Sequence, residues 1–277
     1  MLSPVIHDKS VPHAEHTGSS LRATAILQGR MGSTRLPGKV FFLLSGKPVM
    51  QHVYERIGYC QNLDRIIVAT SVNTEDDCIA EWFDRLGVCV FRGSAEDPLD
   101  RYYQAASAYH AKHVVRIMAD CPLVDPMVVD EVIAKYFDGG YDLCYLGGEF
   151  PTGLDVTVFS YEALERSWKE ARLVSEREHV TPYMSKNPGI FKVGCLEKFQ
   201  GLLRHRWVMD YRQDYEFIRQ IYEALYEPGK IFLSNDVLKL IEGRPHLMKI
   251  NAGIPRDEGY RKAVEREAAA TVSSKDR

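Results

Sequence analysis

The sequence predicts an α/β fold built on a mostly parallel sheet, and three features indicate it. Short apolar runs rich in β-branched residues alternate with longer segments whose apolar residues recur at helical spacing. The runs are apolar at successive positions, which is typical of strands buried on both faces between crossover helices. The 277 residues are 45% hydrophobic and 26% charged, as expected for a globular chain that can bury a sizeable core.

The expected elements follow one another along the chain. Strands are predicted at residues 23–27, 65–70, 88–91, 114–118 and, more weakly, 141–146. Helices are predicted at residues 48–57, 75–86, 97–110 and 126–137. Beyond this point the rhythm changes, with strands expected at 154–159, 190–196 and 205–210, the last returning to the sheet, and helices at 161–171 and 214–226.

The domain organisation is expected to be simple. Residues 1–22 lack the apolar core of a signal peptide and are expected to form a flexible leader. Residues 23–255 are predicted to form one α/β domain, in which 147–200 are an excursion for substrate binding or dimerisation. Residues 256–277 are a charged, Ala-rich tail, predicted to be a helix that frays into 273–277.

Charge and cysteine usage exclude several classes of protein. The net charge of −3 provides no basic field for a nucleic-acid backbone, so any anion site must be local. Six scattered cysteines form no CxxC pair, which argues against a zinc site or a disulfide framework and favours a reducing compartment. No apolar stretch is long enough to span a membrane. We therefore expect a cytoplasmic protein with no nucleic-acid or membrane partner.

The segment "AILQGRMGSTRLPGKV" (25–40) turns abruptly from a buried-type strand into a loop of glycines and cations. A loop at the carboxyl end of a sheet strand is where open α/β folds bind ligands. Gly29 and Gly32 let the backbone approach a ligand, and successive N–H groups can bind an anion. Arg30 and Arg35 add forked donors for phosphate oxygens, and Lys39 adds a point charge. The loop predicts a polyphosphate site; the alternative is a solvated basic turn.

Two common phosphate motifs are excluded by the spacing of this loop. Five residues separate Gly32 from Gly38 where a Walker P-loop has four, and Val40 replaces the hydroxyl residue that binds the metal. No GxGxxG follows the strand, which excludes a dinucleotide fingerprint.

Two aspartates each end an apolar run, Asp120 in "VVRIMAD" and Asp210 in "HRWVMD". Carboxylates at the ends of two strands can meet at one edge of a sheet, where Mg²⁺ would take them together with substrate phosphates. For each aspartate alone the simpler interpretation is a helix N-cap, and Asp125 is expected to be one.

The motifs together resemble a known family. "QGRMGSTRLPGKV" is similar to the signature of the cytidylyltransferases that activate acidic sugars, above all the branch named after spore-coat polysaccharide biosynthesis (SpsF-like), and more distantly the enzymes that make CMP-Kdo and CMP-sialic acid. Further similar blocks follow in the family's order between residues 23 and 236: "IIVATS", "FRGSAEDPLDRYYQAA", "VVRIMADCPLVDP", "GLDVTVF", "REHVTPY" and "RWVMDYRQDYEFI". The resemblance implies a Rossmann-like, GT-A-like nucleotide-diphospho-sugar transferase fold with a mixed sheet.

The resemblance also implies roles for residues. The loop would bind the triphosphate of CTP through Gln28, Gly29, Arg30, Met31, Gly32, Ser33, Arg35 and Lys39. The base would lie near Ala69, Thr70, Ser71, Arg92, Gly93 and Ser94, with Arg101 a further contact unless it forms an exposed pair with Asp100. Mg²⁺, with Mn²⁺ as a possible substitute, would be held by Asp120 and Asp210. The acceptor would meet Asp155, Arg177, His179 and Arg212, although Arg177 and His179 could instead form a dimer contact or a buried ion pair.

The reaction implied is cytidylyl transfer. An oxygen of a small anionic acceptor attacks the α-phosphorus of CTP and pyrophosphate leaves, with Arg30, Lys39, Asp120 and Asp210 as the catalytic groups. The product would be a CMP-activated acidic sugar such as a nonulosonate or Kdo, for a surface polysaccharide or glycoconjugate, and the enzyme would be a homodimer.

Two departures from the family keep other functions open. Thr157 stands where an acidic residue is usual, and Tyr211, Arg212 and Gln213 replace a Thr-Pro-Glu. The added cation could favour a phosphorylated or phosphonate acceptor. A GT-A-type glycosyltransferase and a non-catalytic nucleotide-binding protein are the remaining alternatives.

Overall fold

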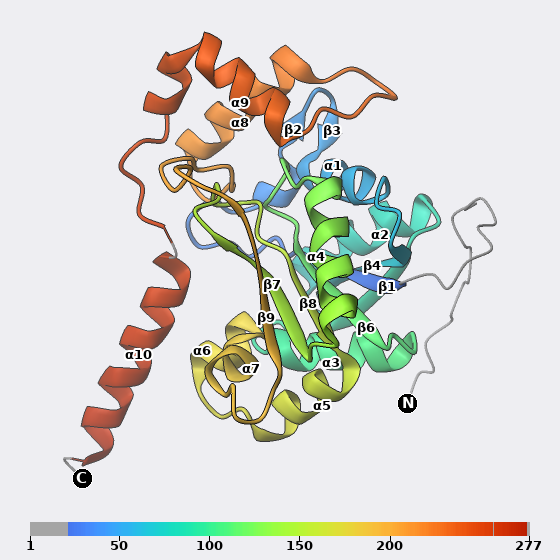
Figure 1. Cartoon of the computed structure of the whole chain (residues 1–277), viewed down its shortest axis with the longest axis vertical. Helices are drawn as coiled ribbons and strands as arrows, with labels where there is room; N and C mark the ends of the chain where they lie inside the picture. The colour runs from blue at the N-terminus through green and yellow to red at the C-terminus, as the bar shows by residue number, and fades with distance from the viewer. Residues whose placement is uncertain (1–21, 257, 276–277) are drawn as a thin grey trace.

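A seven-stranded mixed sheet forms the centre of the computed structural model, which describes residues 22–256 and 258–275 (Figure 1). The strand order is β5-β4-β1-β6-β8-β7-β9. β1, β4, β5 and β6 run parallel, and β8 is antiparallel to both of its neighbours. The strands are β1 (Ala23–Gln28), β4 (Leu63–Ser71), β5 (Cys89–Gly93), β6 (His113–Met118), β7 (Leu143–Gly148), β8 (Thr157–Ser160) and β9 (Val193–Phe199). The predicted α/β class, with a mixed and mostly parallel sheet, is confirmed.

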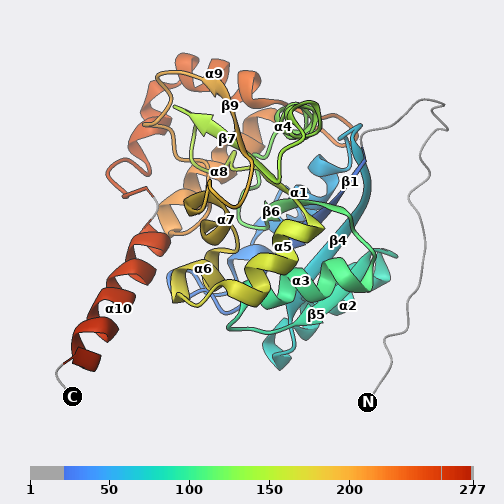
Figure 2. The same ribbon diagram turned by 60° about the horizontal axis from the view of Figure 1, so that its bottom comes forward.

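Helices cover both faces of this sheet (Figures 1 and 2). The larger buried cluster involves α1 (Val49–Ile57), α2 (Asp77–Arg85), α4 (Pro126–Gly139), α8 (Arg212–Leu225) and α9 (Ser234–Gly243). The smaller cluster involves α3 (Pro98–Ala108), α5 (Tyr161–Glu170), the end of α6 (Val174–His179) and α7 (Pro182–Lys186). The short elements are β2 (Leu43–Leu44), β3 (Lys47–Pro48), and the 3-10 turns η1 (Lys39–Phe41), η2 (Thr74–Asp76) and η3 (Pro245–Lys249).

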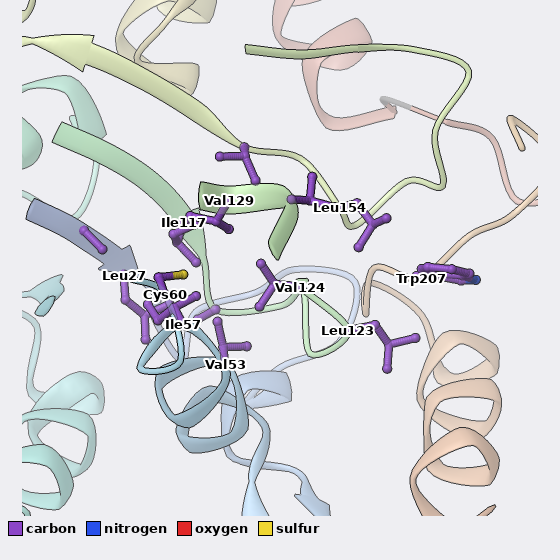
Figure 3. Close-up of a cluster of buried hydrophobic side chains, with 14 of the residues drawn as sticks. Leu27, Val53, Ile57, Cys60, Ile117, Leu123, Val124, Val129, Leu154 and Trp207 are labelled. Atoms are coloured by element: carbon purple, nitrogen blue, oxygen red, sulfur yellow. The ribbon is translucent and has the colours of Figure 1, made fainter. Parts of the chain in front are cut away.

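The larger cluster fixes the strand ends that carry the site. Figure 3 shows Leu27 and Ile117, from the two central strands, packed with Val53 and Ile57 of α1. Trp207 lies at the far side of the same cluster and is fully buried.

Helix starts follow their local sequence signals. Asp97 and Asp125 each precede a proline and accept a hydrogen bond from the first turn of α3 and α4, at 3.0 Å in both cases. The expected cap at Asp125 is therefore present. Ser160 caps α5 in the same way.

One predicted strand is wrong. Residues 205–210 belong to no strand, although Arg206 forms an isolated parallel bridge with Thr152. Trp207 N donates to Thr152 O at 2.6 Å and Met209 N donates to Asp120 O at 2.8 Å, so the segment pairs with loops beyond the strand ends. The apolar run that suggested a strand is buried all the same, since Trp207, Val208 and Met209 are each at most 6% exposed.

Other segments refine the predicted organisation. The excursion at 147–200 supplies β8 and β9 to the main sheet. The C-terminal helix α10 (Glu258–Lys275) contacts α6 and projects beyond the rest of the molecule in both views (Figures 1 and 2). Its backbone stays helical through Ser273 and Ser274, where fraying was expected. The predicted leader falls almost wholly on residues 1–21, outside the described residues. None of the described helices combines the length and the apolar character needed to cross a membrane.

Candidate active site

A cavity of about 340 Å³ opens at the carboxyl ends of β1 and β6. It is lined on one side by the loop after β1 and on the other by the ends of α6 and α10. The sequence-predicted residues that line it are Gln28, Gly29, Arg30, Gly32, Ser33, Arg35, Lys39, Asp120, Asp155, His179 and Asp210. Residues separated by most of the chain therefore meet at one edge of the sheet.

The loop after β1 is held in place by backbone bonds and close packing. Gly29 N donates to Ala69 O of β4, and a Cβ at Gly29 would lie 2.8 Å from the Cβ of Ala119, so only glycine fits there. The carbonyl of Met31 accepts from the N–H groups of both Ser33 and Gly38. Gly38 has φ +71°, the left-handed conformation that favours glycine.

The cationic end of the loop meets both aspartates. Lys39 is 7% exposed, and its ammonium group donates to Asp120 Oδ2 and, at 2.6 Å, to Asp210 Oδ1. Arg35 lies 2.7 Å from the same oxygen of Asp210. The two carboxylates that were predicted to share a cation thus converge on one point, which the lysine nitrogen fills.

Charge pairing keeps Lys39 and Asp210 ionised despite their burial. Burial lowers the pKa of Lys39, but Asp120 and Asp210 outweigh burial and raise it above its usual range. Burial likewise raises the pKa of Asp210, but Lys39 and Arg35 outweigh it and lower the pKa to about 2. Salt bridges that are this buried persist only when both partners stay charged and hydrogen-bonded.

A second layer, not foreseen from the sequence, holds Asp210. Arg206 lies 3.5 Å from Asp210 Oδ2 and pairs with the fully buried Asp214 at 2.9 and 3.0 Å. Asp214 also accepts from the backbone N–H groups of Asp210 and Tyr211. The side chain of Asn251 donates to Asp214 and to the carbonyl of Arg206. Asp214, rather than Asp210, therefore caps the start of α8.

The ends of β4 and β5 lie beside this loop. Arg30 donates to Ala95 O at 2.8 Å, which joins the loop to the turn after β5. The buried Asp76 accepts from Met31 N at 2.6 Å and from both the backbone and the hydroxyl of Ser71. Asp76 thus connects the loop to the end of β4. In the sequence, its place at the end of a short polar turn was the only sign of this role.

A sequence profile of the cytidylyltransferase family matches residues 24–240. The chain belongs to the cytidylyltransferase family. It is accordingly an enzyme of the nucleotidyltransferase class, and the resemblance seen in the sequence is confirmed.

Individual proteins agree with this assignment. The spore coat polysaccharide biosynthesis protein SpsF of Bacillus subtilis is 31% identical over 79% of this chain and 94% of its own length. The 3-deoxy-manno-octulosonate cytidylyltransferase 2 of Hydrogenovibrio crunogenus is 31% identical over 60% of this chain and 65% of its own. The solved structure of a cytidylyltransferase from Leptospira borgpetersenii superposes with a TM-score of 0.77 and 29% identity, covering 86% of this chain and all of that one.

Eight residues predicted to bind the nucleotide lie outside the lining of the cavity in this cytidylyltransferase. One is Met31 of the triphosphate loop, and the others are the base-side residues Ala69, Thr70, Ser71, Arg92, Gly93, Ser94 and Arg101. Arg92 donates to Ser71 O and Asn73 O and pairs with Asp77 at 2.6 Å, which braces the ends of β4 and β5.

The alternative of an exposed pair between Arg101 and Asp100 is wrong. Arg101 is fully buried, because α3 packs its side chain behind Gly93. It donates to Ser94 O at 2.9 Å, while Nε and Nη2 have no hydrogen-bond partner among the described residues. Burial lowers the pKa of this guanidinium.

Two predicted acceptor residues are engaged elsewhere. Arg177 pairs with Asp97 at 2.6 Å and donates to the carbonyls of Trp168 and Ala171, away from the cavity lining. Arg177 therefore forms an ion pair, as the alternative held, but the pair is half-buried rather than buried. Arg212 is exposed, stacks 5.2 Å from the ring centre of Tyr215 and is also outside the lining, so it adds no cation beside the aspartates.

Asp155 and His179 do face the cavity. Asp155 Oδ2 accepts from Gly153 N at 2.9 Å. The ring of His179 meets the edge of Tyr260 at a centroid distance of 5.2 Å. Burial, followed by the nearby Arg116, lowers the pKa of His179, so its imidazole is neutral at pH 7.

The C-terminal helix contributes to the cavity as well, although the sequence suggested only a charged tail. Glu258, Gly259 and Tyr260 line it, and the hydroxyl of Tyr211 donates to Glu258. Arg266 anchors the helix further along by pairing with Glu178 at 2.7 Å.

Proposed function

We propose that this enzyme transfers the cytidylyl group of CTP to a small acidic sugar with release of pyrophosphate, for a surface polysaccharide or glycoconjugate. The observation that carries the proposal is the convergence of Lys39, Asp120 and Asp210 beside a glycine-bearing cationic loop. The named activities of the relatives support the substrate class, since one acts on 3-deoxy-manno-octulosonate and another serves spore-coat polysaccharide synthesis.

The loop is suited to the triphosphate. Arg30, Arg35 and Lys39 all line the cavity and would bind phosphate oxygens together, since no single cation could balance a polyphosphate. Phosphoryl-type transfer needs little covalent chemistry from the protein, so positioning and charge neutralisation supply most of the catalysis. Arg30 and Lys39 would stabilise the pyrophosphate as it departs.

The donor set at Asp120 and Asp210 suits a divalent cation. Two carboxylates directed at one point, with substrate phosphates for the remaining positions, match the preference of Mg²⁺ for oxygen ligands, and Mn²⁺ could replace it. When bound, the ion would neutralise phosphate charge. No cluster of three or more metal-ligating side chains occurs among the described residues, so phosphates would have to complete the site.

The chemical step is then an in-line displacement. The hydroxyl oxygen of the acceptor forms a bond to the α-phosphorus and releases its proton to solvent water, while the bond from that phosphorus to the bridging oxygen breaks and pyrophosphate leaves with the electron pair. The pKa of about 2 makes Asp210 too weak a base to hold the proton of an acceptor hydroxyl, so its carboxylate acts through charge.

The alternative acceptor, a phosphorylated or phosphonate molecule, depended on Arg212. Because Arg212 lies outside the cavity lining, no observation favours that acceptor over an acidic sugar. The glycosyltransferase alternative has no support in the family match.

All six cysteines are free thiols, which suits the cytoplasm we propose. A homodimer stays part of the proposal, to be tested by sedimentation.

The test uses each of CTP, ATP, GTP and UTP with Mg²⁺, pyrophosphatase and a panel of acidic and phosphorylated sugars. We expect phosphate release and a CMP-linked product with CTP and an acidic sugar only. Asp120→Asn and Asp210→Asn should lower kcat by about 100-fold or more. Turnover with a phosphorylated sugar alone would contradict the acceptor, and CTP binding without turnover on any acceptor would contradict the enzymatic role.

A further inference from the structure

The cavity contains one guanidinium that the proposed mechanism does not use. Arg116 lies on β6 and lines the cavity, half-buried. No hydrogen bond or ion pair joins its side chain to any residue that the structure describes, and its buried Nε has no partner. A partly desolvated cation without a partner is costly, so a ligand that supplies an anion would bind there favourably.

The other cations in the lining are all engaged. Arg30 donates to a carbonyl, Arg35 and Lys39 pair with Asp210, and Arg206 pairs with Asp214. Among the described residues of the lining, Arg116 is therefore the guanidinium that remains available to a second anion.

Arg116 lies between the strand that leads into the cationic loop and the strand that follows Asp155. It is in register with Ile26 on β1, the strand that leads into the cationic loop, and with Thr157 on β8, the strand that follows Asp155. Met118 lies two residues later on β6, so its side chain is on the same face of the strand, and it also lines the cavity. Arg116 therefore forms part of the floor, next to the segment that carries Asp155.

Thr157 leaves this guanidinium without a carboxylate. Directly paired residues of antiparallel strands place their side chains on the same face, with Cβ atoms about 5 Å apart. An acidic residue at 157 would thus neutralise Arg116, whereas a threonine cannot. His179, which is close enough to feel the charge of Arg116, is neutral and does not compensate it either.

We propose that Arg116 binds the carboxylate of the acidic-sugar acceptor and so selects for it, an inference that rests on the proposed function. A planar guanidinium matches a carboxylate through two parallel hydrogen bonds. The sugar ring would then extend toward Asp155, His179 and Tyr260, which line the same cavity. Arg116 is on this account a specificity-determining residue, separate from the loop that binds CTP.

The experiment compares Arg116→Gln and Arg116→Lys with wild type. The acceptor is 3-deoxy-manno-octulosonate or N-acetylneuraminate, whichever the wild type turns over, and each is compared with its methyl ester. Arg116→Gln should raise the KM for the acid roughly 10- to 100-fold, leave the KM for the ester and for CTP within about twofold, and be partly rescued in Arg116→Lys. Thr157→Glu should raise the KM for the acid as well. Lys112→Gln, which removes an exposed charge just before β6, is the matched control and should change neither KM.

The outcomes separate this inference from the function on which it rests. An active wild type with an unchanged KM for the acid in Arg116→Gln overturns the role of Arg116 alone. An equal rise in the KM for CTP would place Arg116 in the nucleotide subsite, and an equal rise for acid and ester would show a steric effect; both overturn the inference. A wild type that makes no CMP-linked product from any acidic sugar contradicts the proposed function, and the inference falls with it. If Arg116→Gln does not fold, Arg116→Lys and Thr157→Glu carry the same comparison.

Discussion

The ammonium nitrogen of Lys39 lies 2.6 Å from Oδ1 of Asp210, a residue 171 positions later in the chain. The same nitrogen also bonds to Asp120. The lysine thus lies between the two carboxylates that we propose as metal ligands. Its ammonium group joins them at one point and helps to lower the pKa of Asp210.

Lys39→Ala should lower kcat by about 100-fold or more, because it removes a cation that we propose to stabilise the departing pyrophosphate. The measurement is steady-state phosphate release from CTP with a saturating acceptor. Lys47→Ala is the control, since Lys47 forms a partly exposed pair with Glu55 outside the cavity and should retain normal turnover. Near-normal activity in Lys39→Ala would refute the phosphate role.

Lys39→Met should increase the affinity of the nucleotide-free protein for Mn²⁺. The ammonium occupies the point between the carboxylates, so an ion that binds without CTP must displace it or approach against its charge. We expect the Kd of Mn²⁺, measured from the free-ion signal in electron paramagnetic resonance, to fall about tenfold or more. Equal affinities of wild type and variant would show that the lysine does not compete with the ion, and Asp120→Asn should abolish binding in either background.

The contribution of Asp210 to stability should depend on pH. Burial raises its pKa, but Lys39 and Arg35 outweigh burial and lower the pKa from 3.8 to about 2. The ionised form therefore stabilises the fold above about pH 4, and this stabilisation, on the order of 2 kcal/mol, is lost as the pH falls toward 2. Urea unfolding of wild type and Asp210→Asn should show a steady gap above pH 4 that narrows below it. A gap that is the same at every pH where both proteins fold would rule this out.

The central part of the fold could be predicted because its signals are local. Buried β-branched runs gave β1, β4, β5 and β6, and Asp97 and Asp125 marked the starts of α3 and α4. Residues 205–210 could not be placed, because an apolar run indicates that side chains are buried and not which backbone pairs with them.

The sequence showed which charged residues belong to the site, but not which residues each of them pairs with. Asp120 and Asp210 were expected to converge, since strand ends meet at one edge, and they do so through Lys39. Nothing in the local sequence distinguishes Arg177, which pairs with Asp97, from Arg116, which pairs with no acidic residue in the described part of the chain. The sequence likewise holds no sign that Tyr260, in the first turn of the C-terminal helix, would line the cavity.

Asp76→Ala should weaken CTP binding although Asp76 does not line the cavity. Its carboxylate holds the N–H of Met31 and both donors of Ser71, and removal would leave buried donors unsatisfied. We expect the KM for CTP to rise roughly tenfold and the unfolding free energy to fall by about 3 kcal/mol. Asp84→Ala, at an exposed position of α2, should change neither quantity. A variant with unchanged KM for CTP would mean that the loop needs no anchor at β4.

Gly153→Ala should disturb the fold and the acceptor side together. Gly153 has φ +105°, and a Cβ there would lie 2.6 Å from the backbone carbon of Trp207, so the segment 205–210 would have to shift. Because Asp155 is positioned by the N–H of Gly153 and Asp210 ends that segment, both carboxylates should be displaced. We expect a loss of about 3 kcal/mol in unfolding free energy and a fall in kcat at saturating CTP.

The matched control for this change is Gly189→Ala. Gly189 has nothing within 4 Å of an added Cβ and no left-handed backbone, so its substitution should alter stability by less than about 0.5 kcal/mol. Chemical unfolding and steady-state assays of the two variants side by side separate the steric effect from the general effect of losing a glycine. If both alanine variants lose the same unfolding free energy and keep the wild-type kcat, the close approach of Gly153 to the backbone of Trp207 does not hold Asp155 and Asp210 in place.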